Sequence, residues 1–142
     1  MTNTKGVIVN IKGTDTKIEY SIGNLHIMGL WDKPFKALRN RTKRIEVRTN
    51  TKQIPFDFNY VKSDDKIRFV NEMSGDTFLV RVVIVKVYKS ARSFLEAEGL
   101  THSSSKPKSI EDGIKAIESH TGYKEGIKKH GLFAIEVDKI EN

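Results

Sequence analysis

The chain has 142 residues, a formal net charge of +7 and no cysteine. This length suits one domain with a core that needs no cross-links, and the lack of cysteine excludes disulfides, thiolate zinc sites and a cysteine nucleophile. No apolar run approaches the roughly 20 residues of a membrane span, and residues 1–6 lack the apolar core of a signal peptide. We therefore expect a soluble cytoplasmic protein whose basic charge favours an acidic partner, most commonly nucleic acid.

The first half of the chain has the pattern of short strands around one short helix. Strands are expected at 5–10, 16–20, 25–31, 44–48 and 66–71. Gly13-Thr14-Asp15 supplies turn chemistry between the first two strands. Asp32 can cap a short helix that has Pro34 in its first turn.

The second half combines two longer strands with three short helices. The strand expected at 77–88 is dense in β-branched residues, which favours burial on both faces in its middle. Helical spacing follows at about 90–98, 109–119 and 123–130, with a polar linker at 100–109 and a last strand at 132–140. Many short strands interrupted by small helices favour a barrel with helical insertions over a doubly wound sheet.

Basic residues concentrate between residues 33 and 52, where Glu46 is the only acid. Such cations attract phosphate, and arginine also pairs bidentately or stacks on a base. A carboxylate among cations stays ionised and can accept the exocyclic amine of a base. Two alternatives stay open, namely a merely solvated basic face and a Glu46 that only pairs with Arg48, two residues away on one strand face.

This segment resembles the signature of the ASCH family, in which a helix precedes Gly-x-Lys-x-x-Glu-x-Arg at the start of a strand. Lys43, Glu46 and Arg48 match the charged positions, and Arg41 stands at the glycine. Three further blocks follow in the family's order, at 64–69 with Asp64 in the place of a glycine, at 88–95 and at 123–135.

The resemblance implies an α+β fold, a PUA-like mixed β-barrel flanked by short helices. Residues 25–142 would form the ASCH domain, and residues 1–24 would add an N-terminal β-hairpin extension. In this family the motif strand lines a basic cleft that is proposed to bind RNA.

Carried over, the resemblance predicts that the chain binds RNA, a nucleotide or a modified nucleoside. Lys43 would contact a phosphate or carbonyl, Glu46 would read a base edge, and Arg48 would pair with phosphate or brace Glu46. The full set of expected RNA-binding residues is Lys36, Arg39, Arg41, Lys43, Arg44, Glu46, Arg48 and Tyr88. Trp31 and Phe35 are candidates to stack on a base, although core packing is the commoner role of such residues.

Two other functions stay open. Some ASCH proteins are enzymes, either amidohydrolases of N4-acetylcytidine or ribonucleases, and a catalytic set here would be Lys43, Glu46 and Glu96. In that scheme a carboxylate at Glu96 or Glu98 activates water while Lys43 stabilises the oxyanion, but Glu46 stands where the amidohydrolases have threonine. The third option is a regulatory protein-interaction module that uses the open edge of the N-terminal hairpin.

The four histidines are spread through the chain and match no metal-ligand spacing. We therefore predict neither a metal site nor a cofactor. The sequence leaves the oligomeric state open.

Overall fold

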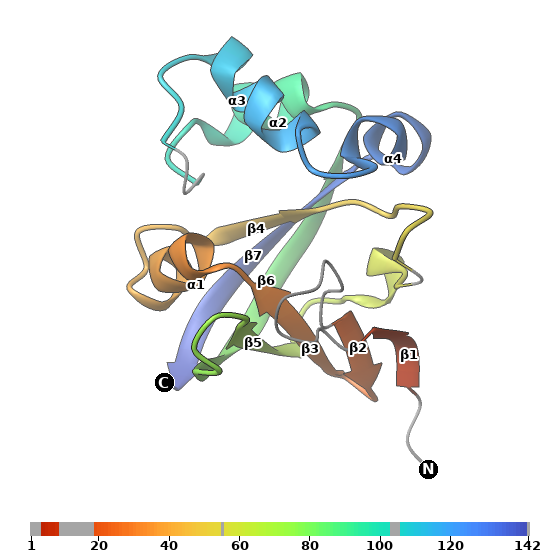
Figure 1. The fold of residues 1–142 in the computed structure, drawn as a ribbon, viewed down its shortest axis with the longest axis vertical. Helices are drawn as coiled ribbons and strands as arrows, with labels where there is room; N and C mark the ends of the chain where they lie inside the picture. The colour runs from red at the N-terminus through yellow and green to blue at the C-terminus, as the bar shows by residue number, and fades with distance from the viewer. Residues whose placement is uncertain (1–3, 9–18, 55, 103–105, 142) are drawn as a thin grey trace.

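Seven strands form one mixed sheet in the computed structural model, which describes residues 4–8, 19–54, 56–102 and 106–141. The strands are β1 (Thr4–Ile8), β2 (Glu19–Ile22), β3 (Leu25–Leu30), β4 (Ile45–Arg48), β5 (Lys66–Asn71), β6 (Thr77–Tyr88) and β7 (Leu132–Glu141). Their spatial order is β1-β2-β3-β5-β6-β7-β4, and only β3 and β5 pair in parallel. The sheet curls into a half-barrel (Figure 1), which confirms the expected α+β, PUA-like fold class.

Four α-helices accompany the sheet, namely α1 (Asp32–Arg39), α2 (Ala91–Glu98), α3 (Ile110–Glu118) and α4 (Tyr123–His130). A 3-10 turn covers Phe58–Tyr60. Helix α1 lies at the side of the curled sheet, whereas β6 and β7 run on to the layer formed by α2, α3 and α4 (Figure 1). Among the helices in the described ranges, none has the length and apolar character needed to cross a membrane.

Hydrogen-bonding side chains start two of the helices where the sequence predicts them. The Ser90 hydroxyl accepts the backbone N–H of Ser93, whose hydroxyl accepts the N–H of Ser90, so α2 begins with a capping box. Ser109 caps α3 by accepting the N–H of Asp112. The predicted cap at Asp32 is wrong, because Asp32 already lies in the first helical turn, where Asn71 and Lys36 contact its carboxylate.

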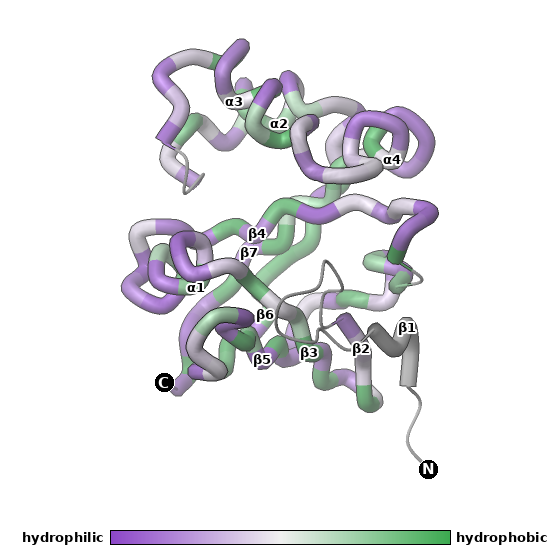
Figure 2. The backbone as a smooth tube through the Cα atoms, in the orientation of Figure 1, coloured by the Kyte–Doolittle hydropathy of each residue, from purple (hydrophilic) through white to green (hydrophobic). Residues whose placement is uncertain are grey.

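The apolar residues form two cores. One fills the half-barrel and is rich in phenylalanine, with Phe78 lying 5.0 Å from Phe35 and 5.5 Å from Phe69 between ring centroids. The other joins the layer of α2, α3 and α4 to β4 and β7. Hydrophobic residues follow the central strands in Figure 2, whereas α1 is largely hydrophilic.

Strand β6 differs from the expectation of burial on both faces. Its first half alternates between buried residues and half-buried ones, and Val87 near its end is 58% exposed. The physical reason is that β6 lies in an antiparallel part of the sheet, between β5 and β7, where a core on one face is sufficient.

The hairpin expected in residues 1–24 is visible in part. β1 pairs with β2 in antiparallel register, Thr4 opposite Ile22, while the predicted turn at 13–15 lies outside the described residues. β2 also pairs with β3, so the sheet continues from this hairpin into the remainder of the chain.

Two residues that stand at glycine positions of the signature adopt left-handed backbone. Arg41 has φ 67° and Asp64 has φ 73°. The turns before β4 and β5 therefore keep a conformation that glycine favours and that costs other residues about 1–2 kcal/mol.

We expect Arg41→Gly to raise the free energy of unfolding by about 1 kcal/mol, because glycine relieves the left-handed strain. Arg41→Ala is the matched control, since it also removes the exposed 3.7 Å ion pair with Asp138 but keeps the strain. Urea unfolding of the three proteins measures the difference. A glycine variant no more stable than the alanine variant would contradict the strain.

Candidate functional site

Strand β4 carries two charged side chains into the interior. Glu46 and Arg48 are two residues apart and share one face of the strand, and the Arg48 Nε atom donates to Glu46 Oε2 at 2.7 Å. Lys43, in the turn before β4, donates from Nζ to Glu46 Oε1 at 2.7 Å. Arg48 also pairs with Glu19 on β2 and donates to the Gly29 carbonyl on β3 at 3.1 Å. We call these four side chains, Glu19, Lys43, Glu46 and Arg48, the buried charge network.

Water is nearly excluded from this network. Glu19 is 0% exposed, Arg48 3%, Glu46 5% and Lys43 8%. Burial by itself raises the pKa of Glu46, but the charges of Lys43 and Arg48 outweigh it and lower the pKa to about 2. Burial likewise disfavours the charged form of Arg48, yet Glu19 and Glu46 outweigh that effect and raise its pKa further. Glu46 and Arg48 therefore stay ionised at neutral pH.

The contacts within the network favour the ion-pair role of Glu46 that the sequence left open. Both of its carboxylate oxygens already accept hydrogen bonds from cations. The guanidinium of Arg48 is committed to two carboxylates and a carbonyl, and it lies 5.8 Å from the ring centroid of Phe58. Lys43 is the most exposed of the four, and only one of the three donors of its ammonium is used in the described structure.

His102, in the loop after α2, lies within electrostatic reach of the Lys43 end of this network. Burial lowers the pKa of His102, and Lys43 and Arg44 lower it too, whereas Glu98 and Glu136 act to raise it. Its Nδ1 atom is buried and has no hydrogen-bond partner in the part of the chain that the structure describes. Charged groups from α2, β7 and the turn before β4 therefore gather around one neutral imidazole.

Tyr88 and Glu98 join this group from the end of β6 and the end of α2. The Tyr88 hydroxyl donates to the Glu98 carboxylate, and this bond is the main reason that the pKa of Tyr88 is raised to about 12. Glu96 is exposed and lies 4.0 Å from Arg92. Two residues along a helix are about 200° apart, so Glu96 and Glu98 point to different sides of α2. The structure therefore brings Glu98, and not Glu96, toward His102.

Most of the other cations predicted to bind RNA have internal partners. Lys36 lies 3.0 Å from Asp32, and Arg41 lies 3.7 Å from Asp138. The guanidinium of Arg39 lies over the Phe35 ring at 5.1 Å from its centroid. Arg44 differs, because it is exposed and makes no ion pair within the described ranges. Of the two stacking candidates, Trp31 is 59% exposed and Phe35 is part of the core.

Comparison with known families decides the assignment, because the model of the ASCH domain matches residues 28–141. The chain belongs to the ASCH domain family. Its fold is similar to the crystal structure of hypothetical protein PH0355, with 31% identity and a TM-score of 0.66 over 80% of this chain and 97% of that one. It is also similar to the solution structure of protein PF0455 from Pyrococcus furiosus, with 33% identity and a TM-score of 0.64 over 83% and 99% of the two chains. No curated protein matches the chain.

Three residues of the site in this ASCH domain escaped the sequence analysis, namely Glu19, His102 and Glu136. No local signal marks them, because tertiary structure brings them together from β2, a loop and β7. Glu98 was one of two candidates for a carboxylate on its helix. Among the described residues, no group of three or more His, Asp or Glu side chains is placed to hold a metal ion.

A Ser–His–Asp set also occurs in this ASCH domain, and its geometry is not that of a catalytic triad. Ser21 Oγ lies 2.5 Å from His26 Nδ1, and His26 Nε2 lies 2.7 Å from Asp65 Oδ2. In a catalytic triad the aspartate contacts Nδ1 of the histidine, and the serine contacts Nε2 and can reach substrate. Here the serine contacts Nδ1, the aspartate contacts Nε2, and Ser21 is buried. The set instead links β2 and β3 to the residue before β5.

Acid unfolding tests the charge network. Because the pKa of Glu46 falls from 4.5 to about 2 on folding, its stabilisation is complete above pH 4.5 and is lost as the pH falls toward 2. A shift of this size corresponds to about 3 kcal/mol. Glu46→Gln should lower stability at neutral pH and remove this part of the acid dependence in denaturant titrations from pH 6 to 2. The exposed control Glu111→Gln should keep the acid dependence of the native protein. If the free energy of unfolding of Glu46→Gln fell as steeply with pH as that of the native protein, the pKa assignment would be refuted.

Proposed function

We propose that this ASCH domain binds single-stranded RNA through the surface around Lys43 and Arg44. The observation that carries the proposal is that the buried charge network fixes the Lys43 ammonium, which is next in sequence to the exposed Arg44 and within electrostatic reach of the His102 imidazole. The net charge of +7 supports an anionic partner. The ASCH family is itself one for which RNA binding has been proposed.

Each group at this surface has a distinct part in the proposal. The two remaining donors of Lys43 contact a phosphate or a base carbonyl, and Arg44 pairs with phosphate through its planar guanidinium. A neutral His102 can donate or accept a hydrogen bond toward a base or a 2′-hydroxyl. Glu46 and Arg48 act as positioning residues that fix Lys43. Trp31 stacks on a base, and the flanking residues Lys36, Arg39, Arg41 and Tyr88 form the rim.

Arg44→Gln should weaken binding of a fluorescent single-stranded RNA without loss of stability, because Arg44 is exposed and has no ion pair in the described structure. Loss of one phosphate contact should lower the slope of log affinity against log salt by about 0.7. Fluorescence anisotropy at several salt concentrations measures both quantities. Lys66→Gln, an exposed lysine on β5, is the control of equal charge change. This interface would be ruled out if RNA affinity did not change with salt concentration, or if Arg44→Gln and Lys66→Gln lowered the affinity equally.

Hydrolysis of a modified nucleoside is the second candidate, and it is favoured by the Glu98 carboxylate and the Lys43 ammonium both acting on His102. In this reaction Glu98 takes a proton from water, and the resulting hydroxide attacks the acetyl carbonyl of N4-acetylcytidine. Lys43 stabilises the oxyanion, the amide C–N bond breaks, and protonation of the leaving nitrogen gives cytidine and acetate.

Chromatography of N4-acetylcytidine incubated with the protein tests this reaction. Cytidine should appear with the native protein and with Glu96→Gln, but not with Glu98→Gln or Lys43→Ala. Turnover that depended on Glu96 and not on Glu98 would support the carboxylate named from the sequence instead. Absence of cytidine at high protein concentration would exclude this substrate.

A further inference from the structure

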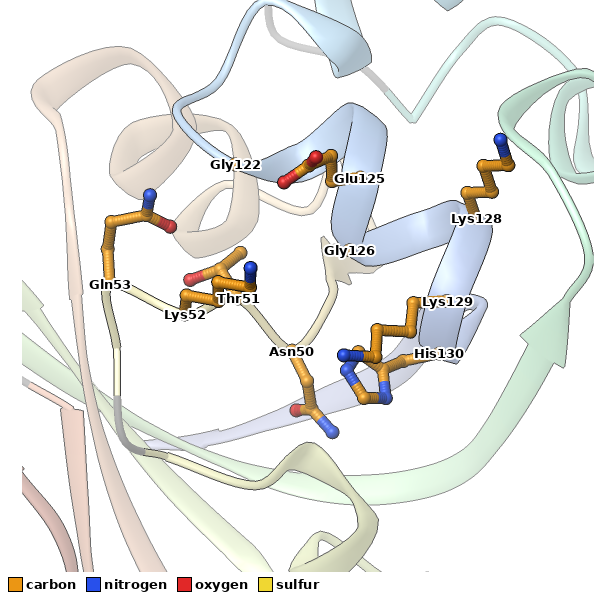
Figure 3. A pocket seen from close by; sticks show the side chains of 10 residues that line it. All are labelled: Asn50, Thr51, Lys52, Gln53, Gly122, Glu125, Gly126, Lys128, Lys129 and His130. Atoms are coloured by element: carbon orange, nitrogen blue, oxygen red, sulfur yellow. The ribbon is translucent and has the colours of Figure 1, made fainter.

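A second group of cations surrounds a cavity away from Lys43. The cavity has a volume of about 430 Å³ and lies between residues 50–53 and helix α4 (Figure 3). Its lining includes Lys52, Lys128, Lys129 and His130, and among the described residues Glu125 is the only acid there. This volume lies within the usual range of small-molecule sites, so it can hold a phosphate together with its sugar.

Two glycines allow α4 to lie close to residues 50–53, which form the opposite side of the cavity. Gly126 lies within α4, and Gly122 is its N-cap. A Cβ atom at Gly126 would lie 2.4 Å from the Asn50 carbonyl oxygen, so no other residue fits there without movement of the backbone. Gly122 has φ 78°, and a Cβ there would lie 2.5 Å from Gln53 Oε1. The close contact along this glycine face holds the last turn of α4, with its lysines and His130, beside residues 50–53.

The lysines at this cavity are available to a ligand. Within the described ranges, Lys52, Lys128 and Lys129 are exposed and have no ion pair, unlike Lys36, Arg41 and Arg48. Asn50 adds a side-chain amide at the cavity, and its Nδ2 donates to Asp57. The Oγ1 atom of Thr51, a residue that also lines the cavity, is buried with no hydrogen-bond partner in the described structure.

The cavity is connected to the proposed RNA-binding surface through β4. The chain runs from Arg44 through β4 directly into Asn50 and Lys52, a path of at most about 28 Å when extended. Tyr123 is the first residue of α4, and its side-chain hydroxyl oxygen accepts a hydrogen bond from the backbone N–H of Thr49. The same hydroxyl lies within electrostatic reach of Arg48 and Glu46. A short oligonucleotide can therefore reach from one group of cations to the other.

We infer that this cavity is a second phosphate site, in which Lys52, Lys128 and Lys129 bind a backbone phosphate of the RNA whose other part contacts Lys43 and Arg44. The inference rests on the proposed function and extends it, because it names where the strand continues. Lysine suits this task as a flexible point charge, and three unpaired ammonium groups favour an anion without selecting a base.

The test replaces Lys52, Lys128 and Lys129 together by glutamine. The matched control replaces Lys62, Lys66 and Lys115 by glutamine, because these lysines are also exposed and carry the same total charge. On a 12-nucleotide single-stranded RNA, the cavity variant should lose on the order of ten-fold in affinity, and its salt slope should fall by about 2. The control should keep the native slope to within about 1. Equal losses in the two variants would overturn the inference, and circular dichroism checks that both are folded.

A phosphate titration separates failure of this inference from failure of the proposed function. Inorganic phosphate, compared with chloride at equal ionic strength, should shift the amide resonances of residues 50–53 and 125–130 in the ¹⁵N-labelled native protein, and not in the cavity variant. If the native protein binds no RNA, the proposed function fails, and these shifts alone decide whether the cavity binds phosphate. If phosphate and chloride act alike, the site is refuted.

Discussion

The ion pairs of Arg48 hold one end of the sheet to the other. Arg48 belongs to β4 at one edge, whereas Glu19 and Gly29 belong to β2 and β3 near the opposite edge, so these contacts require the sheet to curl. Burying charges costs several kcal/mol per ion, and well-packed apolar residues often give equal stability. What the charges add is position, because an ionised Glu46 fixes the Lys43 ammonium at the margin of the barrel.

Local patterns in the sequence were sufficient for the fold class and for most element positions. The charged motif at 43–48 also led to the correct family, and Arg41 and Asp64, which stand at glycine positions of the family pattern, both have a positive φ. Side-chain partners could not be predicted in the same way. Arg48 looked like a phosphate ligand because its partner Glu19 lies 29 residues away, in a segment read as an extension. The choice between Glu96 and Glu98 likewise depends on which side of α2 faces Tyr88, which helical spacing alone does not give.

The two groups of cations show that the number of basic residues and their availability are separate properties. The segment around α1 and β4 is the most basic stretch of the sequence, yet acidic or aromatic partners occupy Lys36, Arg39, Arg41 and Arg48. Around α4 the lysines are fewer but unpaired in the described structure. In the first region a phosphate has to displace carboxylates or an aromatic ring from these cations. Around α4 no ion pair of the described structure has to be broken, so each contact requires only that the ammonium group and the phosphate lose water.

The position of β4 also has a consequence for how the protein is made. Its sheet neighbour is β7, and the pairing of Arg48 with Phe133 spans 85 residues of the chain. Because synthesis proceeds from the N-terminus, the motif strand leaves the ribosome long before the strand that completes it. Until then, Glu46 and Arg48 remain hydrated and the half-barrel lacks its last edge. Contacts of such long range slow folding, so the site around residues 43–48 is among the last parts of the molecule to form, although it lies in the first half of the sequence.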